Sequence, residues 1–244
     1  MAESNCKIKD LRTGDSPAKR YCALTHGDIP LWQVVRNELL VLFFGSIPGP
    51  IGLALRKFFY PCMFKHCGDK VVFGRAVSFR HASKISLGDG CILDDDVMID
   101  AKGTTNEGIT LGDGVYVGRH TTIYCKNGDI VLGPRVNVSS NCTLFSSNRL
   151  EIGKGCMIGA YSYFLSGGEY DYRDSTPYCE QSGMCTKGPL VIGSDCWFGT
   201  RVTVLDATGS IGDRAVIAAC ALVMKPVPAH TLVGGVPAKV LKQV

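Results

Sequence analysis

Several features that mark common classes of protein are missing from this sequence. The first thirty residues lack the apolar run of a secretory signal, so we expect a cytoplasmic protein. No long run of lysine and arginine occurs and the formal net charge is only +4, which argues against nucleic acid as a partner. The 29 glycines follow no Gly-x-y period, which excludes collagen. With 45% apolar residues, the 244-residue chain can nevertheless bury a sizeable core.

What the sequence does contain is an unusual amount of cysteine. Disulfides are rare in reducing compartments, so the twelve cysteines of a chain without a secretory signal are expected to be thiols. Cys62 and Cys67 flank His66, but no second Cys/His pair lies at a suitable spacing. We therefore expect no metal site.

An aliphatic residue followed by glycine recurs along two thirds of the chain. Stepping six residues twice from each of these aliphatic residues reaches another large apolar residue. The triplets are Leu87/Leu93/Ile99, Leu111/Val117/Ile123, Leu132/Val138/Leu144, Ile152/Ile158/Phe164, Ile192/Phe198/Val204 and Ile211/Ile217/Val223, and Phe73/Phe79 begins a shorter seventh. A hexapeptide period of this kind marks a parallel β-helix.

The period also predicts the geometry. Six residues accommodate a short strand and a corner, so three repeats make one triangular coil with the large apolar residues pointing inward. Glycine follows each of them because a Cβ would be costly at the bend. The step between triplets varies from seven to twenty-eight residues, so every irregularity falls at one corner. We predict an all-β solenoid of about seven coils over residues 67–227, with a long functional loop at 166–190.

Four of the cysteines share one position in the repeat. It lies four residues after an inward aliphatic residue and otherwise holds only small side chains. The four are Cys91, Cys142, Cys156 and Cys196. We predict that they are compact buried residues, whereas Cys179 and Cys185 in the long loop are expected to be the more reactive thiols.

The N-terminal third differs in character from the repeat. Residues 1–28 are polar and are predicted to form a flexible arm, and residues 29–66 to form an apolar helical segment. Its two apolar stretches, 31–44 and 51–65, are each too short to span a bilayer, which takes ~20 apolar residues. Two interpretations stay open. The helices pack on the solenoid or a neighbouring subunit, or residues 31–65 make a peripheral membrane contact, because bulky apolar residues lie beside arginine and lysine.

The most specific motifs lie in residues 190–240. They are Ile192-Gly193, Trp197-Phe198-Gly199 and the tail Val233-Gly234-Gly235-Val236-Pro237-Ala238-Lys239. This segment resembles the closing part of hexapeptide-repeat acyltransferases, and the order of the segments is most similar to the sugar and polysaccharide O-acetyltransferase members. The resemblance covers residues 70–242, about 70% of the chain, with the tail at 228–244.

The resemblance carries further expectations. It implies that the coils are left-handed and that the protein is a homotrimer with active sites between neighbouring prisms. It also implies that acetyl- or another acyl-coenzyme A is the co-substrate and that the acceptor is a hydroxyl or amine of a sugar or glycolipid. Such a protein would act in surface polysaccharide or glycolipid biosynthesis, in the cytoplasm or at the inner face of the membrane.

Acyl transfer needs a general base, and here the sequence departs from the family. The resemblance places a histidine on the long loop, in a Gly-Gly-x-His-like context, but residues 166–172 read SGGEYDY. Glu169 or Tyr170 takes that position. Either a carboxylate of Glu169 or Asp171 acts as the base, or His81 or His120 reaches the groove from a neighbouring subunit. The third alternative is a non-catalytic scaffold or binding module.

The resemblance places the coenzyme against the last coils, where small residues let the backbone approach its pantetheine arm. Relatives often have Gly-Ala-Gly where this chain has Ala218, Ala219 and Cys220. Lys239 matches a tail lysine that lies close to the coenzyme phosphates, where a cation has an electrostatic rationale. Trp197 and Gly199 are the other candidates for this slot.

Overall fold

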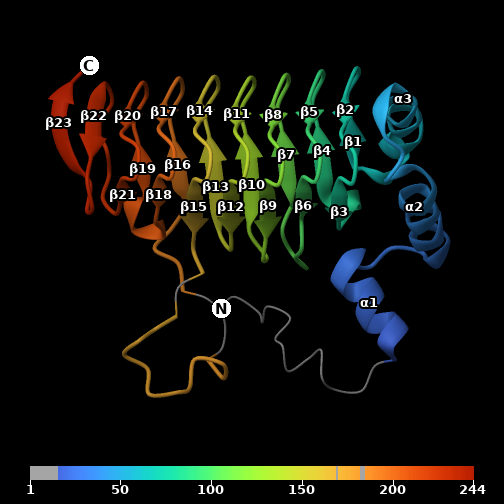
Figure 1. The fold of residues 1–244 in the computed structure, drawn as a ribbon. Coiled ribbons are helices and arrows are strands. Elements are labelled where there is room, and N and C mark those ends of the chain that lie inside the picture. Colours follow the sequence, from blue (N-terminus) through green and yellow to red (C-terminus); the bar gives the residue numbers. More distant parts are fainter. Residues whose placement is uncertain (1–15, 169, 182–184) are drawn as a thin grey trace.

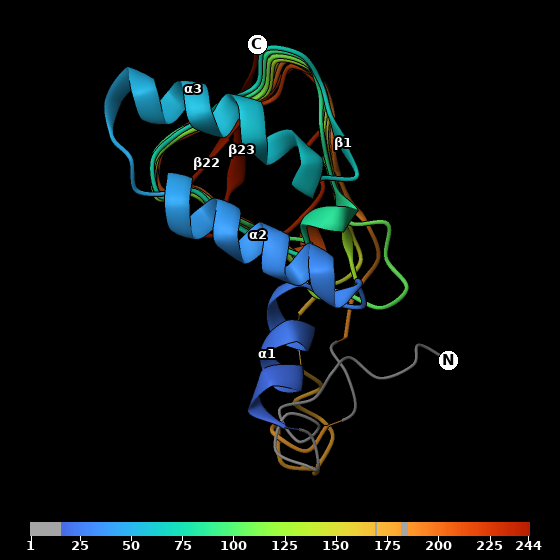
Figure 2. The same ribbon diagram turned by 90° about the vertical axis from the view of Figure 1, so that its right-hand side faces the viewer.

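The computed structural model describes residues 16–168, 170–181 and 185–244, and it shows helices leading into a β-solenoid (Figure 1). The helices are α1 (Pro17–Thr25), α2 (Leu31–Phe44) and α3 (Gly49–Phe59), followed by the short 3-10 turn η1 (Tyr60–Met63). Helices α2 and α3 lie where the two apolar stretches predicted helical structure. Figure 2 shows both of them lying across the N-terminal end of the solenoid.

The second half of the predicted flexible arm forms a helix instead. The Ser16 side chain accepts a hydrogen bond from the Lys19 N–H (3.4 Å), and Pro17 begins α1 with a φ angle that already suits a helix. The helix is tied to the solenoid at its far end, where the His81 N–H donates to the Thr25 carbonyl (2.8 Å). Residues 1–15 of the predicted arm lie outside the described residues.

Three sheets form the faces of the solenoid. Sheet A contains β1 (His66–Cys67), β4 (Ile85–Leu87), β7 (Ile109–Leu111), β10 (Asp129–Leu132), β13 (Arg149–Ile152), β16 (Leu190–Ile192) and β19 (Ser210–Ile211). Sheet B contains β2 (Val72–Phe73), β5 (Ile92–Leu93), β8 (Tyr116–Val117), β11 (Asn137–Val138), β14 (Met157–Ile158), β17 (Trp197–Phe198), β20 (Val216–Ile217), β22 (Thr231–Gly234) and β23 (Lys239–Gln243). Sheet C contains β3 (Ser78–Arg80), β6 (Met98–Asp100), β9 (Thr122–Cys125), β12 (Thr143–Ser146), β15 (Tyr163–Ser166), β18 (Thr203–Val204) and β21 (Leu222–Val223). Neighbouring strands run parallel, except for the antiparallel pair β22 and β23.

The predicted repeat register is confirmed. Members of the six complete triplets pair with their equivalents in the next coil, as Leu87 does with Leu111, and all eighteen are at most 2% exposed. Cys67 pairs with Leu87 and completes the first coil, which the sequence pattern left short. Val227 bridges to Ile211 and, with β22, begins an eighth coil. The core is therefore one continuous apolar column along the axis.

The repeat glycines are required by close contact between coils. A Cβ on Gly88 would lie 2.5 Å from Asp113 Oδ1 and 2.7 Å from the Asp113 nitrogen of the next coil. The left-handed backbone angles that glycine usually supplies fall at other corner positions, for example at Asp96 (φ 59°) and His120 (φ 56°). The glycine after each inward residue therefore meets a packing constraint, and the left-handed bends are made by other residues, among them Asp96 and Gly90 (φ 65°).

All the larger insertions leave the solenoid at the corner between sheets C and A. The segments are 101–108 after β6, 167–189 after β15, and the 3-10 turns η2 (Ala82–Lys84) and η3 (Asp206–Thr208). The segment after β15 extends furthest from the prism, on the same side as α1 (Figure 1). The prediction of a single interrupted corner is thus confirmed, while the left-handed sense of the coils stays a prediction of the resemblance.

Candidate active site

The long loop leaves and rejoins the solenoid at one buried carboxylate. Asp206, the first residue of η3, is 1% exposed. Its Oδ1 accepts hydrogen bonds from the Gly167 N–H (2.5 Å) and from the Thr186 hydroxyl (3.3 Å), and its Oδ2 accepts one from the Lys187 N–H (2.5 Å). A side chain of the following coil therefore fixes both ends of the loop.

The first loop residues lie on an aromatic surface. A Cβ on Gly168 would be 2.7 Å from the Phe145 ring, and that ring lies 4.7 Å from the ring of Tyr124, centroid to centroid. Burial, with a smaller contribution from the neighbouring Tyr163, raises the pKa of Tyr124 to about 12. The Tyr124 phenol is therefore a neutral group at physiological pH, beside the point where the loop begins.

The structure gives the loop candidates different surroundings. Glu169 lies outside the described residues. Tyr170 is 47% exposed, with its ring 6.0 Å from that of Tyr178. Asp171 is exposed and accepts a hydrogen bond from the Arg173 N–H (2.9 Å), so its carboxylate closes a turn within the loop. In the single chain these described side chains face solvent.

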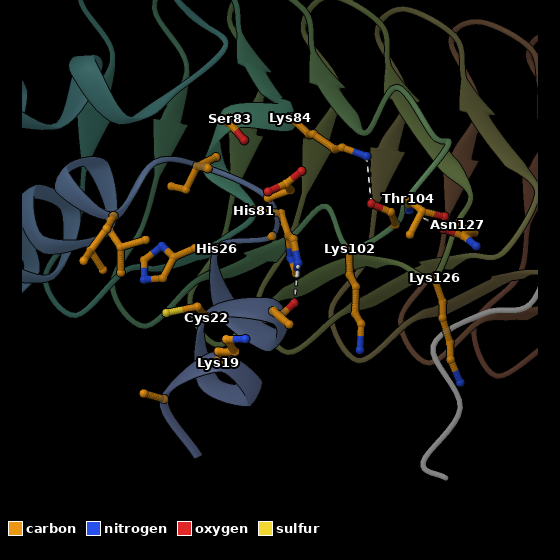
Figure 3. A pocket seen from close by; sticks show the side chains of 18 residues that line it. Lys19, Cys22, His26, His81, Ser83, Lys84, Lys102, Thr104, Lys126 and Asn127 are labelled. Atoms are coloured by element: carbon orange, nitrogen blue, oxygen red, sulfur yellow. Dashed lines mark hydrogen bonds between the residues drawn. The ribbon is translucent and has the colours of Figure 1, made fainter. Parts of the chain in front are cut away.

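His81 lies at the same corner as the loop but in the first coil, four coils earlier. Only 4% of the residue is exposed. Its Nδ1 is 2.9 Å from Asp100 Oδ1, and its Nε2 is 3.3 Å from the Ala23 carbonyl oxygen of α1 (Figure 3). Both partners are hydrogen-bond acceptors, so the ring nitrogen that carries the hydrogen donates to one of them, and the contact with Ala23 links α1 to the solenoid.

A cavity of about 800 Å³ surrounds His81 between α1, the start of α2 and the corners of the first coils (Figure 3). Its helical wall includes the apolar Ala23 and Val34 together with Lys19 and His26, and its solenoid wall carries lysines. The Lys84 ammonium there donates to the Gly103 carbonyl (2.8 Å). No described residue of the loop at 167–189 lines this cavity. It lies at the opposite end of the solenoid from the predicted coenzyme slot.

His120 occupies a different corner, between sheets B and C in the third coil. Its side chain is 59% exposed, and its Nδ1 lies 3.9 Å from Asp96 Oδ2. The corner is two coils away from the loop. Within one chain, the structure therefore brings neither His81 nor His120 to the loop.

The predicted coenzyme residues, in contrast, lie close together. Gly199 stacks against the next coil, where a Cβ would lie 2.6 Å from the Ala219 nitrogen. Ala219 and Cys220 are exposed and Ala218 is half-buried, so this corner between sheets B and C presents backbone rather than side chains. The Ala219 N–H has no acceptor among the described residues, which leaves it able to donate to a ligand carbonyl.

The tail folds back over the same corner. The Ala238 N–H donates to the Leu222 carbonyl (2.8 Å), and the exposed Lys239 pairs with Gly234 across β22 and β23. Trp197 is 61% exposed on the outer face of sheet B, in the coil that also contains Gly199. The tail lysine and the small-residue corner therefore form one continuous surface on the last coils.

The cysteines behave as the repeat predicts. The four in the small-residue position are at most 1% exposed: Cys91, Cys142, Cys156 and Cys196. Burial raises the pKa of the Cys91 thiol, which fits a packing role. Cys179 and Cys185 are exposed thiols. Within the described ranges, no cluster of three or more His, Cys, Asp or Glu side chains could hold a metal ion.

Comparison with known proteins finds a match to part of the repeat. Residues 189–223 match the model described as the hexapeptide repeat of succinyl-transferase. The chain is a hexapeptide-repeat protein. It is 32% identical over 111 residues to a chloramphenicol acetyltransferase of Agrobacterium fabrum, covering 40% of this chain and 53% of the relative. It is 29% identical over 136 residues to the Mycobacterium tuberculosis protein named "Probable acetyltransferase Rv3034c", covering 55% and 44%.

A solved structure shows the same fold. It is AntD, an N-acyltransferase of Bacillus cereus in complex with dTDP and 3-hydroxybutyryl-CoA, with a TM-score of 0.52 and 16% identity over 75% of this chain and 84% of the other. The hexapeptide-repeat protein described here spans about half the length of the curated relatives it matches. The resemblance predicted from the tail is confirmed.

The sequence of this hexapeptide-repeat protein did not point to Asp206 or Asp100, although Asp206 is buried at the two ends of the long loop and Asp100 is buried against His81. For Asp206 a weak signal exists. It lies in the only segment where the step between triplets is seven, at the corner from which the long loop departs. Asp100 carries no such signal, because its partner His81 belongs to the preceding coil.

Proposed function

We propose that this hexapeptide-repeat protein is an acyltransferase that moves an acetyl or other acyl group from acyl-coenzyme A to a hydroxyl or amine of a sugar. The observation that carries the proposal is the small-residue corner of Gly199, Ala218 and Ala219, which lies within the segment that matches the family model. The acetyltransferase names of the relatives support the same activity.

The corner fits a pantetheine arm on three grounds. Its exposed small side chains let a linear chain approach the backbone, the Ala219 N–H is available to donate to an amide carbonyl, and Lys239 adds a cation for a phosphate. Trp197 would line the edge of the slot. The coenzyme supplies the activated thioester, and the protein supplies binding and orientation.

In the reaction, the acceptor oxygen or nitrogen attacks the thioester carbonyl carbon, a C–O or C–N bond forms and the C–S bond breaks. The acceptor proton passes to a base, and the sulfur leaves as a thiol once it has received a proton. We assign the base to Glu169, the loop carboxylate among the two residues that take the position of the family's histidine in the sequence. We assign His81 to positioning α1, because its ring is buried between Asp100 and the Ala23 carbonyl of that helix.

We further propose a homotrimer. Residues 171–180 of the loop, including Asp171, are exposed in the single chain, and a neighbouring prism related by threefold symmetry would cover them. Tyr170 and Asp171 would then line the acceptor side of the site, and His120 of a neighbour would be free to enter the groove. A glycolipid acceptor would place the protein in the cytoplasm, at the inner face of the membrane.

Coenzyme binding tests the proposal. Calorimetry should show coenzyme A binding to the wild type and roughly tenfold weaker binding to Lys239→Ala, because one phosphate contact is lost. Lys242→Ala on the same strand is the matched control and should bind as the wild type does. No binding at millimolar coenzyme A would overturn the enzyme assignment in favour of a non-catalytic scaffold.

Turnover tests the base. Release of free coenzyme A thiol from acetyl-coenzyme A, with a panel of sugars as acceptors, should fall 10²-fold or more in Glu169→Gln, a typical general-base effect. Asp174→Asn, at an exposed loop carboxylate that accepts a hydrogen bond from the Thr176 N–H (2.8 Å), controls for loss of a loop carboxylate and should keep most of the activity. Full activity in Glu169→Gln would overturn the assignment of the base while leaving the coenzyme slot intact.

A further inference from the structure

The helices at the N-terminal end of the solenoid expose an unusual number of large apolar side chains. Those that are at least 60% exposed are Leu31 (72%), Trp32 (62%), Leu42 (72%), Phe43 (61%), Ile51 (70%) and Phe58 (78%). All six belong to α2 and α3, which lie across the end of the prism (Figure 2). We name this surface the cap face.

On α2 the exposed residues form a continuous stripe. Trp32, Val35, Leu39 and Phe43 follow one another at intervals of three or four residues, so they lie along one side of the helix. The opposite side carries the buried Val34 and Asn37. A surface helix normally turns its apolar side to the core. This one also presents an apolar stripe outward.

The α3 helix adds to the same end of the molecule. Its buried Arg56 donates to the Phe73 carbonyl (2.9 Å) of β2 and to the Ile47 carbonyl (2.8 Å), which locks the helix onto the first coil. Ile51 and Phe58, two turns apart, are left exposed on it. The cap face is therefore carried by rigidly seated helices.

Neither helix is long enough to cross a bilayer. The 14 residues of α2 give it a length of about 21 Å, against a hydrocarbon thickness of ~30 Å. A search of the described residues finds no helix that could span a membrane. An apolar stripe of this length suits insertion parallel to a surface.

The charges of this segment are mostly positive. Residues 31–65 contain four basic residues and one acidic residue; Arg56 is buried, so the others give 3 − 1 = +2. The acidic residue is Glu38, and its Oε1 accepts hydrogen bonds from the Tyr21 hydroxyl (2.7 Å) and from His26 (2.8 Å). Arg36 lies 5.3 Å from the Trp32 ring centroid, so a cation accompanies the outward aromatic residue.

We propose that the cap face docks on an anionic phospholipid bilayer, with Trp32, Phe43 and their neighbours inserted at the level of the headgroups. Positive charge beside inserted aromatic and aliphatic residues is the combination that binds such surfaces. A second copy of the chain is the less suitable occupant. Two cap faces packed against each other would bring Arg36 and Lys57 towards like charges, and Glu38 is already engaged with α1.

Vesicle sedimentation without acyl donor or acceptor tests this proposal separately from catalysis. The wild type should sediment with vesicles of phosphatidylcholine and phosphatidylglycerol, and less with phosphatidylcholine alone. Trp32→Ser and Phe43→Ser should each lower the partition coefficient roughly tenfold, since each removes one inserted aromatic side chain. Leu241→Ser, at a residue 60% exposed on β23 at the other end of the solenoid, is the matched control.

Fluorescence gives a second measurement. In a Trp197→Phe background, Trp32 is the only tryptophan, and its emission should shift to shorter wavelength when anionic vesicles are added. A wild type that stays in the supernatant with anionic vesicles, or a Trp32 emission that does not move, overturns the proposal. So does a Phe43→Ser variant, folded by circular dichroism, that sediments like the wild type. If the wild type binds no vesicles and its assembly has twice the mass of the Trp32→Ser variant, the occupant of the cap face is a second copy of the chain.

Discussion

The carboxylate of Asp206 is expected to control the order of the long loop without controlling the fold. It accepts hydrogen bonds from the Gly167 and Lys187 backbone N–H groups and from the Thr186 hydroxyl, at a site where the residue is 1% exposed. Asp206→Asn keeps the shape but replaces one acceptor oxygen with an amide that faces a donor. A hydrogen bond to a charged group contributes about 1.5–3 kcal/mol, and a stranded buried donor costs a similar amount.

Because the substituted side chain can still accept at one oxygen, we expect the anchored loop to lose about 3 kcal/mol relative to its released state. That corresponds to roughly a hundredfold increase in local opening. Hydrogen exchange monitored by mass spectrometry or NMR should therefore show the Gly167 and Lys187 amides exchanging roughly a hundredfold faster. The amides of β12 belong to the coil core and should keep their wild-type protection.

Asp213→Asn is the matched control for this experiment. Its carboxylate lies in the next coil and accepts a hydrogen bond from the Ser194 N–H (2.7 Å), so the substitution removes the same charge at a site that does not touch the loop. It should leave exchange at Gly167 and Lys187 unchanged. Wild-type protection of both amides in Asp206→Asn would refute the view that this carboxylate holds the loop.

Three further predictions follow from burial. The pKa of Tyr124 is about 12 in the folded protein and near 10 in the unfolded chain, so between these pH values the unfolded chain releases a proton that the folded protein retains. The free energy of unfolding should therefore fall between pH 10 and 12, and it should fall less in Tyr124→Phe. Phe198→Ala should lower the free energy of unfolding, measured in urea, by about 3–5 kcal/mol, because the Phe198 ring is buried 5.1 Å from that of Phe164. Trp197→Ala, on the outer face of sheet B, should lower the free energy of unfolding by less than about 1 kcal/mol. A thiol reagent should label the native protein at its exposed cysteines and reach the buried ones only in denaturant. Among the residues that the structure describes, the exposed ones are Cys62, Cys179, Cys185 and Cys220.

The solenoid could be predicted from the sequence because every coil repeats the same spacing of inward apolar residues. Each inward residue stacks on an equivalent one about twenty residues away, so one rule of spacing repeats many times. Helix α1 could not be predicted in this way. Its polar sequence carries only the Ser16-Pro17 start signal, and what holds it is a contact from His81 to Ala23, residues 58 positions apart.

The same distinction applies to the site. The small residues at Gly199 and Ala219 could be located because their place in the repeat is the one where neighbouring coils approach closely. Asp206 could not, since a single buried acid in an irregular corner has no periodic signature. The base could not be fixed from the sequence either, because residues 166–172 lack the histidine that the resemblance places there.

The proposed activities lie at opposite ends of a rigid column, and this leads to a last prediction. The cap face belongs to α2 and α3, and the coenzyme slot belongs to the last coils and β23 (Figure 1). Sites with no shared contacts act independently, and their energetic effects add. Trp32→Ser should therefore bind coenzyme A as tightly as the wild type, and Lys239→Ala should bind vesicles as the wild type does. The double variant, Trp32→Ser with Lys239→Ala, should show the two separate effects on coenzyme affinity and on vesicle affinity. If either affinity differs from that expectation by more than a few-fold, the column transmits a change between its ends, or oligomer assembly links the two sites.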